Sequence, residues 1–177
     1  LYGASAGALM LWDESADALI VRGATEDHAT TSAGRIVLQT NQAAVADGDR
    51  IGQIDFQASN ETGADALLVS ASIWAEADDT FDATGNETEL VFATGASETA
   101  AEQMRLTSSG QLGINIATPA SLLDVRGTVQ VGVDDTGHDV KFFGATSGSY
   151  WLWDEDADGV VQVGSTQLTG AVTVGVD

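Results

Sequence analysis

The chain has 177 residues and carries 27 acidic side chains against six basic ones, which gives a formal net charge of −21. This excess argues against a nucleic-acid partner and against insertion into or binding to an anionic membrane, because phosphates and anionic lipids are recognised through Lys and Arg. The absence of cysteine excludes disulfides and thiolate metal sites. No apolar run approaches the roughly 20 residues that a membrane-spanning helix needs.

Small and β-branched residues dominate the apolar fraction of the composition. Aromatic residues make up 6% and there are 20 glycines. Such side chains favour pleated, closely packed strands over a thick globular core, so we expect an all-β fold. The chain begins at Leu1 in the middle of a repeat pattern, and we expect it to be a piece of a longer protein.

The first segment, residues 1–23, predicts a β-hairpin. An apolar strand ends at Leu11-Trp12, acidic and small residues form a turn, and a second strand covers Ala18–Val21. The pattern returns 141 residues later, where Leu11-Trp12-Asp13-Glu14 is repeated as Leu152-Trp153-Asp154-Glu155. A shorter echo places Val131–Asp134 again at Val174–Asp177. Repeats of this kind are typical of units that stack along an axis.

Between the two hairpins the apolar residues alternate with polar ones, a period of two that marks half-buried strands. We expect the apolar alternate residues, such as Ile54 with Phe56 and Leu90 with Phe92, to share a buried face. Five segments show the pattern: Arg35–Thr40, Arg50–Ala58, Ala66–Ala75, Glu89–Thr94 and Gln103–Ser108.

Three further segments complete the expected elements. Residues 97–103 have the composition of one helical turn, and Val129, Val131 and Val133 alternate as in a strand. Between them, Met104–Gly127 contains two short strands around a turn at Ser109-Gly110, then the only proline, Pro119, and a third strand that leads into Thr128–Val133. We interpret this stretch as a junction. The expected organisation is a Trp-Asp-Glu hairpin in 1–24, a β-rich module in 25–127 and a second Trp-Asp-Glu repeat in 128–177.

Five segments of the chain share the pattern of a known module: Asp49–Phe56, Glu89–Thr94, Glu102–Leu106, Ser108–Ile114 and Thr118–Gly127. In this order and spacing they resemble a module of bacteriophage tail-fibre proteins, and the hairpin segments are similar to repeats in long marine phage fibres. Two departures stand out: Asn115-Ile116 replaces the usual Gly-Thr, and Gln103 replaces an Arg. Asn tolerates the left-handed backbone that Gly would adopt, so we expect the turn to persist.

The resemblance implies short-strand β modules in tandem, assembled as an intertwined homotrimeric fibre in the virion. The implied partners are other copies of the chain, neighbouring fibre segments, and a host surface glycan or receptor. No catalytic activity and no cofactor are implied. The pattern of the residues agrees with a trimer, because three chains could bury one face of every strand and leave the acidic faces outside.

Residues 154–159 open like a calcium-binding loop, with carboxylates at Asp154, Asp156 and Asp158 followed by a glycine. The twelfth position is Ser165 instead of a bidentate Glu, and the first repeat has Ser15 where Asp156 stands. These departures favour a hairpin turn with solvated acids, and Ca²⁺ remains the alternative. The histidines, His28 and His138, have no partner that suggests a metal site, and no nucleophile elbow is present.

Tryptophans supply the other candidate site, because aromatic faces stack on sugars. Trp74 and Trp151 are the candidates for binding a glycan or receptor. Trp12 and Trp153 occupy equivalent repeat positions, which favours packing. The sequence therefore predicts a structural component of a phage tail fibre, a trimeric β-rich shaft that supports host adhesion. The alternative is a receptor- or glycan-binding module of a virion or a bacterial surface filament.

Overall fold

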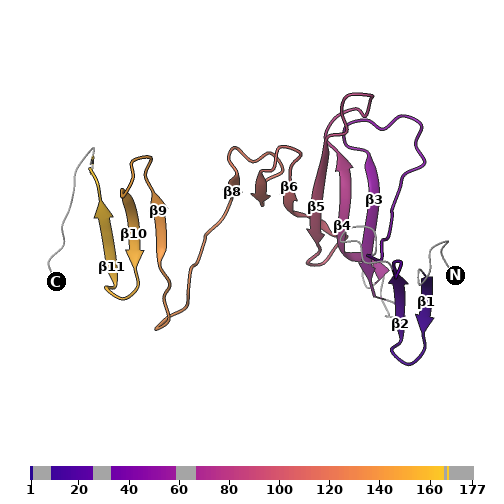
Figure 1. Cartoon of the computed structure of the whole chain (residues 1–177), viewed down its shortest axis with the longest axis horizontal. Helices are drawn as coiled ribbons and strands as arrows, with labels where there is room; N and C mark the ends of the chain where they lie inside the picture. The colour runs from indigo at the N-terminus through magenta and orange to yellow at the C-terminus, as the bar shows by residue number, and fades with distance from the viewer. Residues whose placement is uncertain (2–8, 26–32, 59–66, 166, 168–177) are drawn as a thin grey trace. The chain divides into compact units, whose positions relative to one another are not determined.

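The computed structural model describes residues 1, 9–25, 33–58, 67–165 and 167. Its regular elements are all β-strands, and the expected β-rich class is confirmed (Figure 1). In the described part of the chain, no helix has the length and apolarity to cross a membrane. Contacts divide the chain into two units, residues 1–126 and 127–177. The first Trp-Asp-Glu hairpin is grouped with the β-rich segment that follows it.

The first unit contains a two-stranded hairpin and a six-stranded sheet. The hairpin pairs β1 (Leu9–Asp13) with β2 (Ala18–Arg22), as the sequence predicts. Neighbours in the sheet follow chain order and are antiparallel, except the last two strands, which are parallel. The sheet consists of β3 (Arg50–Gln57), β4 (Val69–Ala77), β5 (Thr88–Thr94), β6 (Ala101–Leu106), β7 (Leu112–Ile114) and β8 (Leu123–Val125).

The register of this sheet sorts its side chains onto two faces. Residues directly opposite each other share a face, and successive residues alternate between faces. One face, which we call the apolar face, carries two rows that cross all six strands. The first row is Ile54, Ile73, Phe92, Met104, Ile114 and Val125, and the second is Gly52, Ala75, Leu90, Leu106, Leu112 and Leu123.

The opposite face, which we call the charged face, holds the buried core. Trp74 is 6% exposed and Val91 is 0% exposed, and both pack with Ala93. Among the described residues, no strand of another sheet contributes to this core cluster, and long side chains of the six-stranded sheet itself cover it. The Arg50 guanidinium lies 4.0 Å from the centre of the Trp74 ring, and Arg105 is the cross-strand neighbour of Val91. The methylene groups of such residues shield apolar atoms while their charged ends stay near water.

The face of the sheet that is buried within one chain is the opposite of the face that the sequence predicts to be buried. The sequence predicts that the face with Ile54, Phe56, Leu90 and Phe92 is buried, but within one chain Ile54, Phe56 and Leu90 are exposed. The reason is that a single-layered sheet has little material to cover both faces, and the long side chains of Arg50 and Arg105 lie over the other one.

The second unit contains a three-stranded antiparallel sheet of β9 (Val140–Phe143), β10 (Tyr150–Asp154) and β11 (Gly159–Val163). Its β10–β11 hairpin reproduces β1–β2 in detail. Trp12 pairs with Leu19 as Trp153 pairs with Val160. In both turns the first Asp accepts a hydrogen bond from the backbone N–H three residues later, at 3.3 Å. The fourth residue after it, Asp17 or Asp158, has a positive φ of 47° or 46°. The sequence repeat is therefore a structural repeat.

Three predicted elements are absent. Residues 35–40 form no strand, and the segment is paired in none of the described sheets. It lies against the six-stranded sheet instead, where a Cβ added to Gly52 would be 2.6 Å from the Leu38 Cβ. The predicted helical turn over 97–103 is wrong, since Ala101–Gln103 belong to β6, in which Ala101 and Glu102 pair with β5. Residues 128–139 form no strand either. They make one isolated bridge, between Val133 and Thr136, and no strand in the described part of the chain pairs with them.

Other predictions were made for parts of the chain that lie outside the described residues. These are His28, the beginning of the first repeat and the second echo over 174–177. The predicted turn at Ser109-Gly110 is present, and Pro119 lies in the connection between β7 and β8. Asn115 does adopt the left-handed conformation, with φ of 58°.

The turn at Asn115 provides a test of local backbone strain. Its side-chain amide donates to the Arg126 carbonyl at 3.0 Å. Asn115→Val should lower the free energy of unfolding by about 2 kcal/mol, because a β-branched residue resists positive φ and cannot form the hydrogen bond. Asn115→Gly, which keeps the backbone freedom and loses only the hydrogen bond, should cost about 1 kcal/mol. Urea unfolding followed by circular dichroism measures both, and equal losses would contradict this account.

Candidate functional site

The charged face carries a cluster in which one arginine serves three carboxylates from three adjacent strands. Arg105 on β6 contacts Glu102 through Nε at 2.9 Å and through Nη2 at 2.6 Å, and Glu76 on β4 through Nη1 at 3.2 Å. The same Nη1 is bonded to Glu89 on β5. Glu89 and the Arg105 side chain are largely buried. The cluster ties β4, β5 and β6 together, and it leaves negative charge in excess of the single guanidinium.

The excess charge affects protonation. Burial, together with the neighbouring Glu76 carboxylate, raises the pKa of Glu102 although Arg105 contacts both of its oxygens. At the edge of the same face, hydrogen bonds from Ser72 and Gln53 lower the pKa of Asp55. The sequence analysis missed this cluster. A lone Arg within an alternating strand, flanked by strands with Glu at alternate positions, is the signal that could have indicated it.

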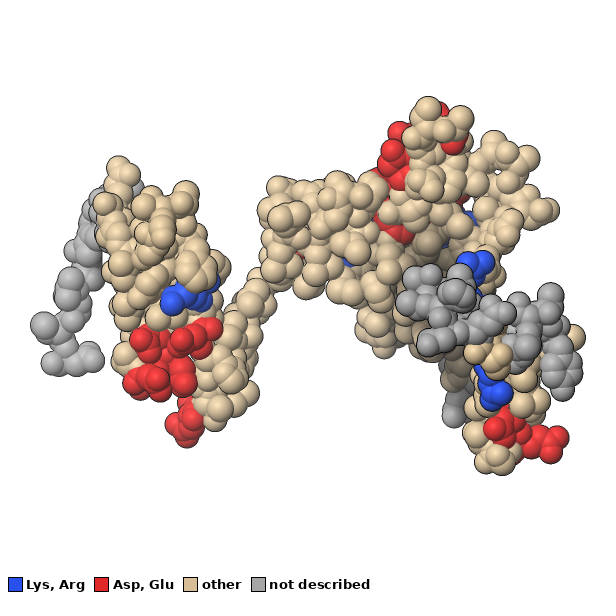
Figure 2. Space-filling model, viewed as in Figure 1, with Lys and Arg blue, Asp and Glu red and all other residues tan. Residues whose placement is uncertain are grey.

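The predicted calcium ligands lie in the β10–β11 turn. Asp154 uses its Oδ1 to hold the Ala157 N–H, and Asp158 adopts positive φ, so both residues shape the turn. Asp156 is exposed. Nearby, a hollow of about 460 Å³ is lined in part by Asp134, Asp135, Glu155 and Asp158. Figure 2 shows acidic atoms gathered at this turn and at the equivalent β1–β2 turn. No group of three or more His, Asp or Glu suited to a metal ion occurs among the described residues.

The predicted sugar-binding tryptophans differ in their surroundings. Trp74 is buried, its ring is covered by Arg50, and its Nε1 donates to Glu76 at 2.8 Å. These contacts favour a packing role. Trp151 is partly exposed on β10, and its ring centre lies 5.6 Å from that of Phe142 at an angle of 42°.

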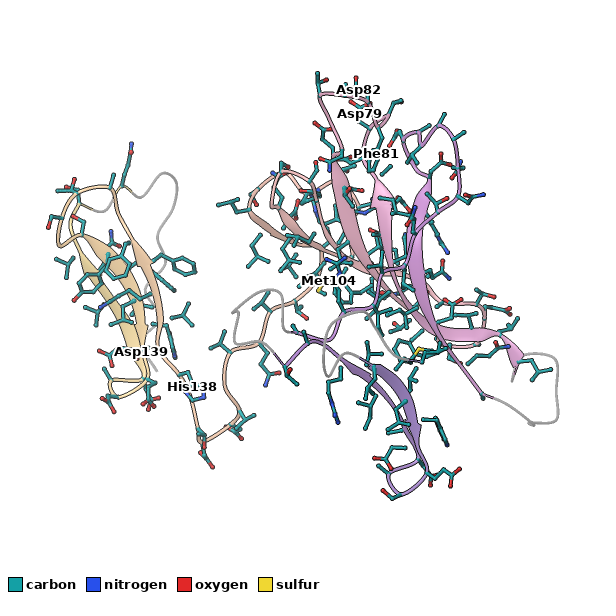
Figure 3. The ribbon with its side chains drawn as sticks, turned by 45° about the vertical axis from the view of Figure 1, so that its right-hand side comes forward. Asp79, Phe81, Asp82, Met104, His138 and Asp139 are labelled. Atoms are coloured by element: carbon teal, nitrogen blue, oxygen red, sulfur yellow. The ribbon has the colours of Figure 1, made fainter. Side chains whose placement is uncertain are left out.

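A groove of about 560 Å³ lies at one end of the three-stranded sheet, beside Trp151. Its walls combine aromatic rings with hydroxyl and amide groups, and the contributing residues include Phe142, Thr146, Ser149, Tyr150, Trp151 and Gln162. Lys141 lies 4.1 Å from the Tyr150 ring centre. His138 and Asp139 precede β9 (Figure 3), and the Asp139 carboxylate accepts the Glu155 N–H at 3.1 Å.

Comparison of the chain with models of known protein families and with curated proteins gave no match.

The Glu102 environment predicts how stability depends on pH. The unfolded chain protonates this group around its ordinary value of 4.5, while the folded chain protonates it at higher pH. The folded state therefore binds more protons as the pH falls from 7 toward 4.5, and this group's contribution to stability rises over that window. In Glu102→Gln the rise should be missing, which urea unfolding at pH 7 and pH 5 would show.

The matched control for this prediction is Glu98→Gln, which changes the same charge in the loop between β5 and β6. It should retain the pH dependence of the unaltered chain. If Glu102→Gln also retained that dependence, the burial of Glu102 would not be the cause.

Proposed function

We propose that the chain is a structural component of a phage tail fibre, a homotrimeric β-rich shaft that supports host adhesion. The order of the fibre-like segments supports this proposal, as does the all-β fold in which those segments form β3, β5, β6, β7 and β8. The structural equivalence of the two Trp-Asp-Glu hairpins supports it too, because recurrence of one unit is how a shaft sets its length.

The observation that carries the proposal is the exposure of large apolar side chains on the six-stranded sheet. They include Ile54, Phe56, Leu90, Leu106, Ile114 and Leu123. The core cluster consists of Trp74, Val91 and Ala93. A two-stranded hairpin such as β1–β2 has little stability alone. A chain with so small a core needs further burial, and association with other copies supplies it.

The proposed mechanism is mechanical. Copies that bury their apolar surfaces together form a stiff rod, and the acidic residues on the outside keep the rod soluble through mutual repulsion. Catalysis has no part in the proposal. The virion is the proposed location, with neighbouring fibre segments as further partners.

The mass of the chain in solution tests the proposal. Sedimentation equilibrium should give about three times the 18.2 kDa of one chain, and the mass should persist on dilution because the interface is apolar. A folded monomer at micromolar concentration would refute the shaft.

A receptor- or glycan-binding module is the second candidate, and the groove beside Trp151 is the observation that favours it. Sugar sites combine an aromatic face with a few hydrogen-bonding groups, and the groove offers both. Tryptophan fluorescence during titration with mono- and disaccharides should change in the unaltered chain and not in Trp151→Ala. Trp12→Ala, at the exposed tryptophan of the first hairpin, is the control. A fluorescence change that survives Trp151→Ala would place any sugar elsewhere.

A further inference from the structure

We infer that the apolar face of the β3–β8 sheet is the surface through which copies of this chain associate, with the apolar face of a second copy as its occupant. This inference rests on the proposed multi-copy assembly and adds to it the contact surface. It concerns the six-stranded sheet alone and requires no particular arrangement of the two units.

The apolar face has the composition of a protein core, but one chain does not bury its side chains. The two rows defined above contain twelve residues, all of them apolar or glycine, and none of them is fully buried. Five of them, Ile54, Leu90, Leu106, Ile114 and Leu123, are between 38% and 59% exposed. Phe56, one row further along β3, is also exposed. Met104 lies on the central part of this face, on β6 (Figure 3).

The size of the face exceeds what a monomer usually leaves uncovered. Six strands at a spacing of about 4.8 Å extend for about 24 Å from the first to the last. Both rows of apolar residues span this distance. Monomeric proteins rarely expose contiguous apolar patches of more than a few hundred Å². Beside this face, a groove of about 250 Å³ is lined by Ile36, Leu38, Ile51, Ile54 and Leu90 among others, and it could receive an apolar side chain of a partner.

The distribution of charge identifies a second copy as the occupant. A chain of net charge −21 would repel another copy if their carboxylates met. In the sheet, however, the carboxylates of Glu76, Glu89 and Glu102 lie with Arg105 on the charged face. By register, Asp55 and Asp124 lie on that face as well. Two copies can therefore meet through their apolar faces without bringing acidic groups together.

The same distribution argues against other occupants. A basic protein or a nucleic acid would be selected by charge, and the apolar face offers none. Rows of medium-sized aliphatic side chains fit a like surface, and the apolar faces of three copies related by a threefold axis can converge on one shared core.

The test combines charge insertion with cross-linking. Leu106→Lys should convert the multi-copy species into a species of 18.2 kDa in sedimentation equilibrium, because a lysine would be buried between apolar rows. Leu19→Lys, on the β1–β2 hairpin, is the matched control: Leu19 is 56% exposed and lies outside the sheet. It should leave the mass unchanged. Circular dichroism reports whether each variant keeps its strands.

The natural absence of cysteine permits a second measurement that does not disturb the fold. Single variants Leu90→Cys, Leu106→Cys and Ile114→Cys are oxidised under native conditions and run on a non-reducing gel. At least one should give a covalent dimer, and Leu19→Cys should not. If Leu106→Lys fails to fold, the cross-linking pattern alone decides whether the apolar face is the contact surface.

The outcomes separate the two proposals. A multi-copy unaltered chain that keeps its mass in folded Leu106→Lys, or that cross-links only through Leu19→Cys, overturns the assignment of the apolar face and leaves the fibre proposal standing. A monomeric unaltered chain overturns both. A multi-copy chain that is dissociated by Leu106→Lys and cross-linked through the apolar face supports both.

Discussion

A single layer of strands has two faces, and this chain has the means to cover one. In the β3–β8 sheet the covered face is the one where arginine and glutamate side chains extend over Trp74 and Val91. Most other features of the first unit depend on this choice. It decides which residues form the core, where charge collects, and which apolar residues stay exposed for a partner. The arrangement differs from that of most globular domains, where a second layer provides the cover.

The Arg105 cluster shows how the covered face maintains its order. A guanidinium is a planar, permanently charged group with five N–H donors, and here it serves carboxylates from three strands. Salt bridges of this kind contribute less to stability than their number suggests, because the charges lose solvation. Their value here lies in alignment, since sliding β5 against β4 or β6 by one residue would move Glu89 to the opposite face.

Much of the fold could be predicted from the sequence. Alternation located β3, β5 and β6 within a few residues, the Trp-Asp-Glu repeat located both hairpins, and Asn115 was recognised as a left-handed turn residue. The prediction failed where alternation occurred without a partner strand, as at 35–40 and 128–133. It also failed at Ala101–Gln103, because pairing with β5 outweighs the weak helical preference of a short segment. Of the candidate site residues, Trp151 is near a groove, whereas Trp74 is part of the core.

The sequence by itself determined the β-rich class, the internal repeat, the acidic balance and the two faces of each strand, because alternation and composition are local properties. Only the tertiary structure decided which face is covered within one chain and which carboxylates meet Arg105. Both depend on the register between strands that are distant in sequence, and on where the loops and long side chains fold. The alternation of residues shows that the two faces of a strand differ in polarity. The packing on either side of the sheet decides which face is exposed to water.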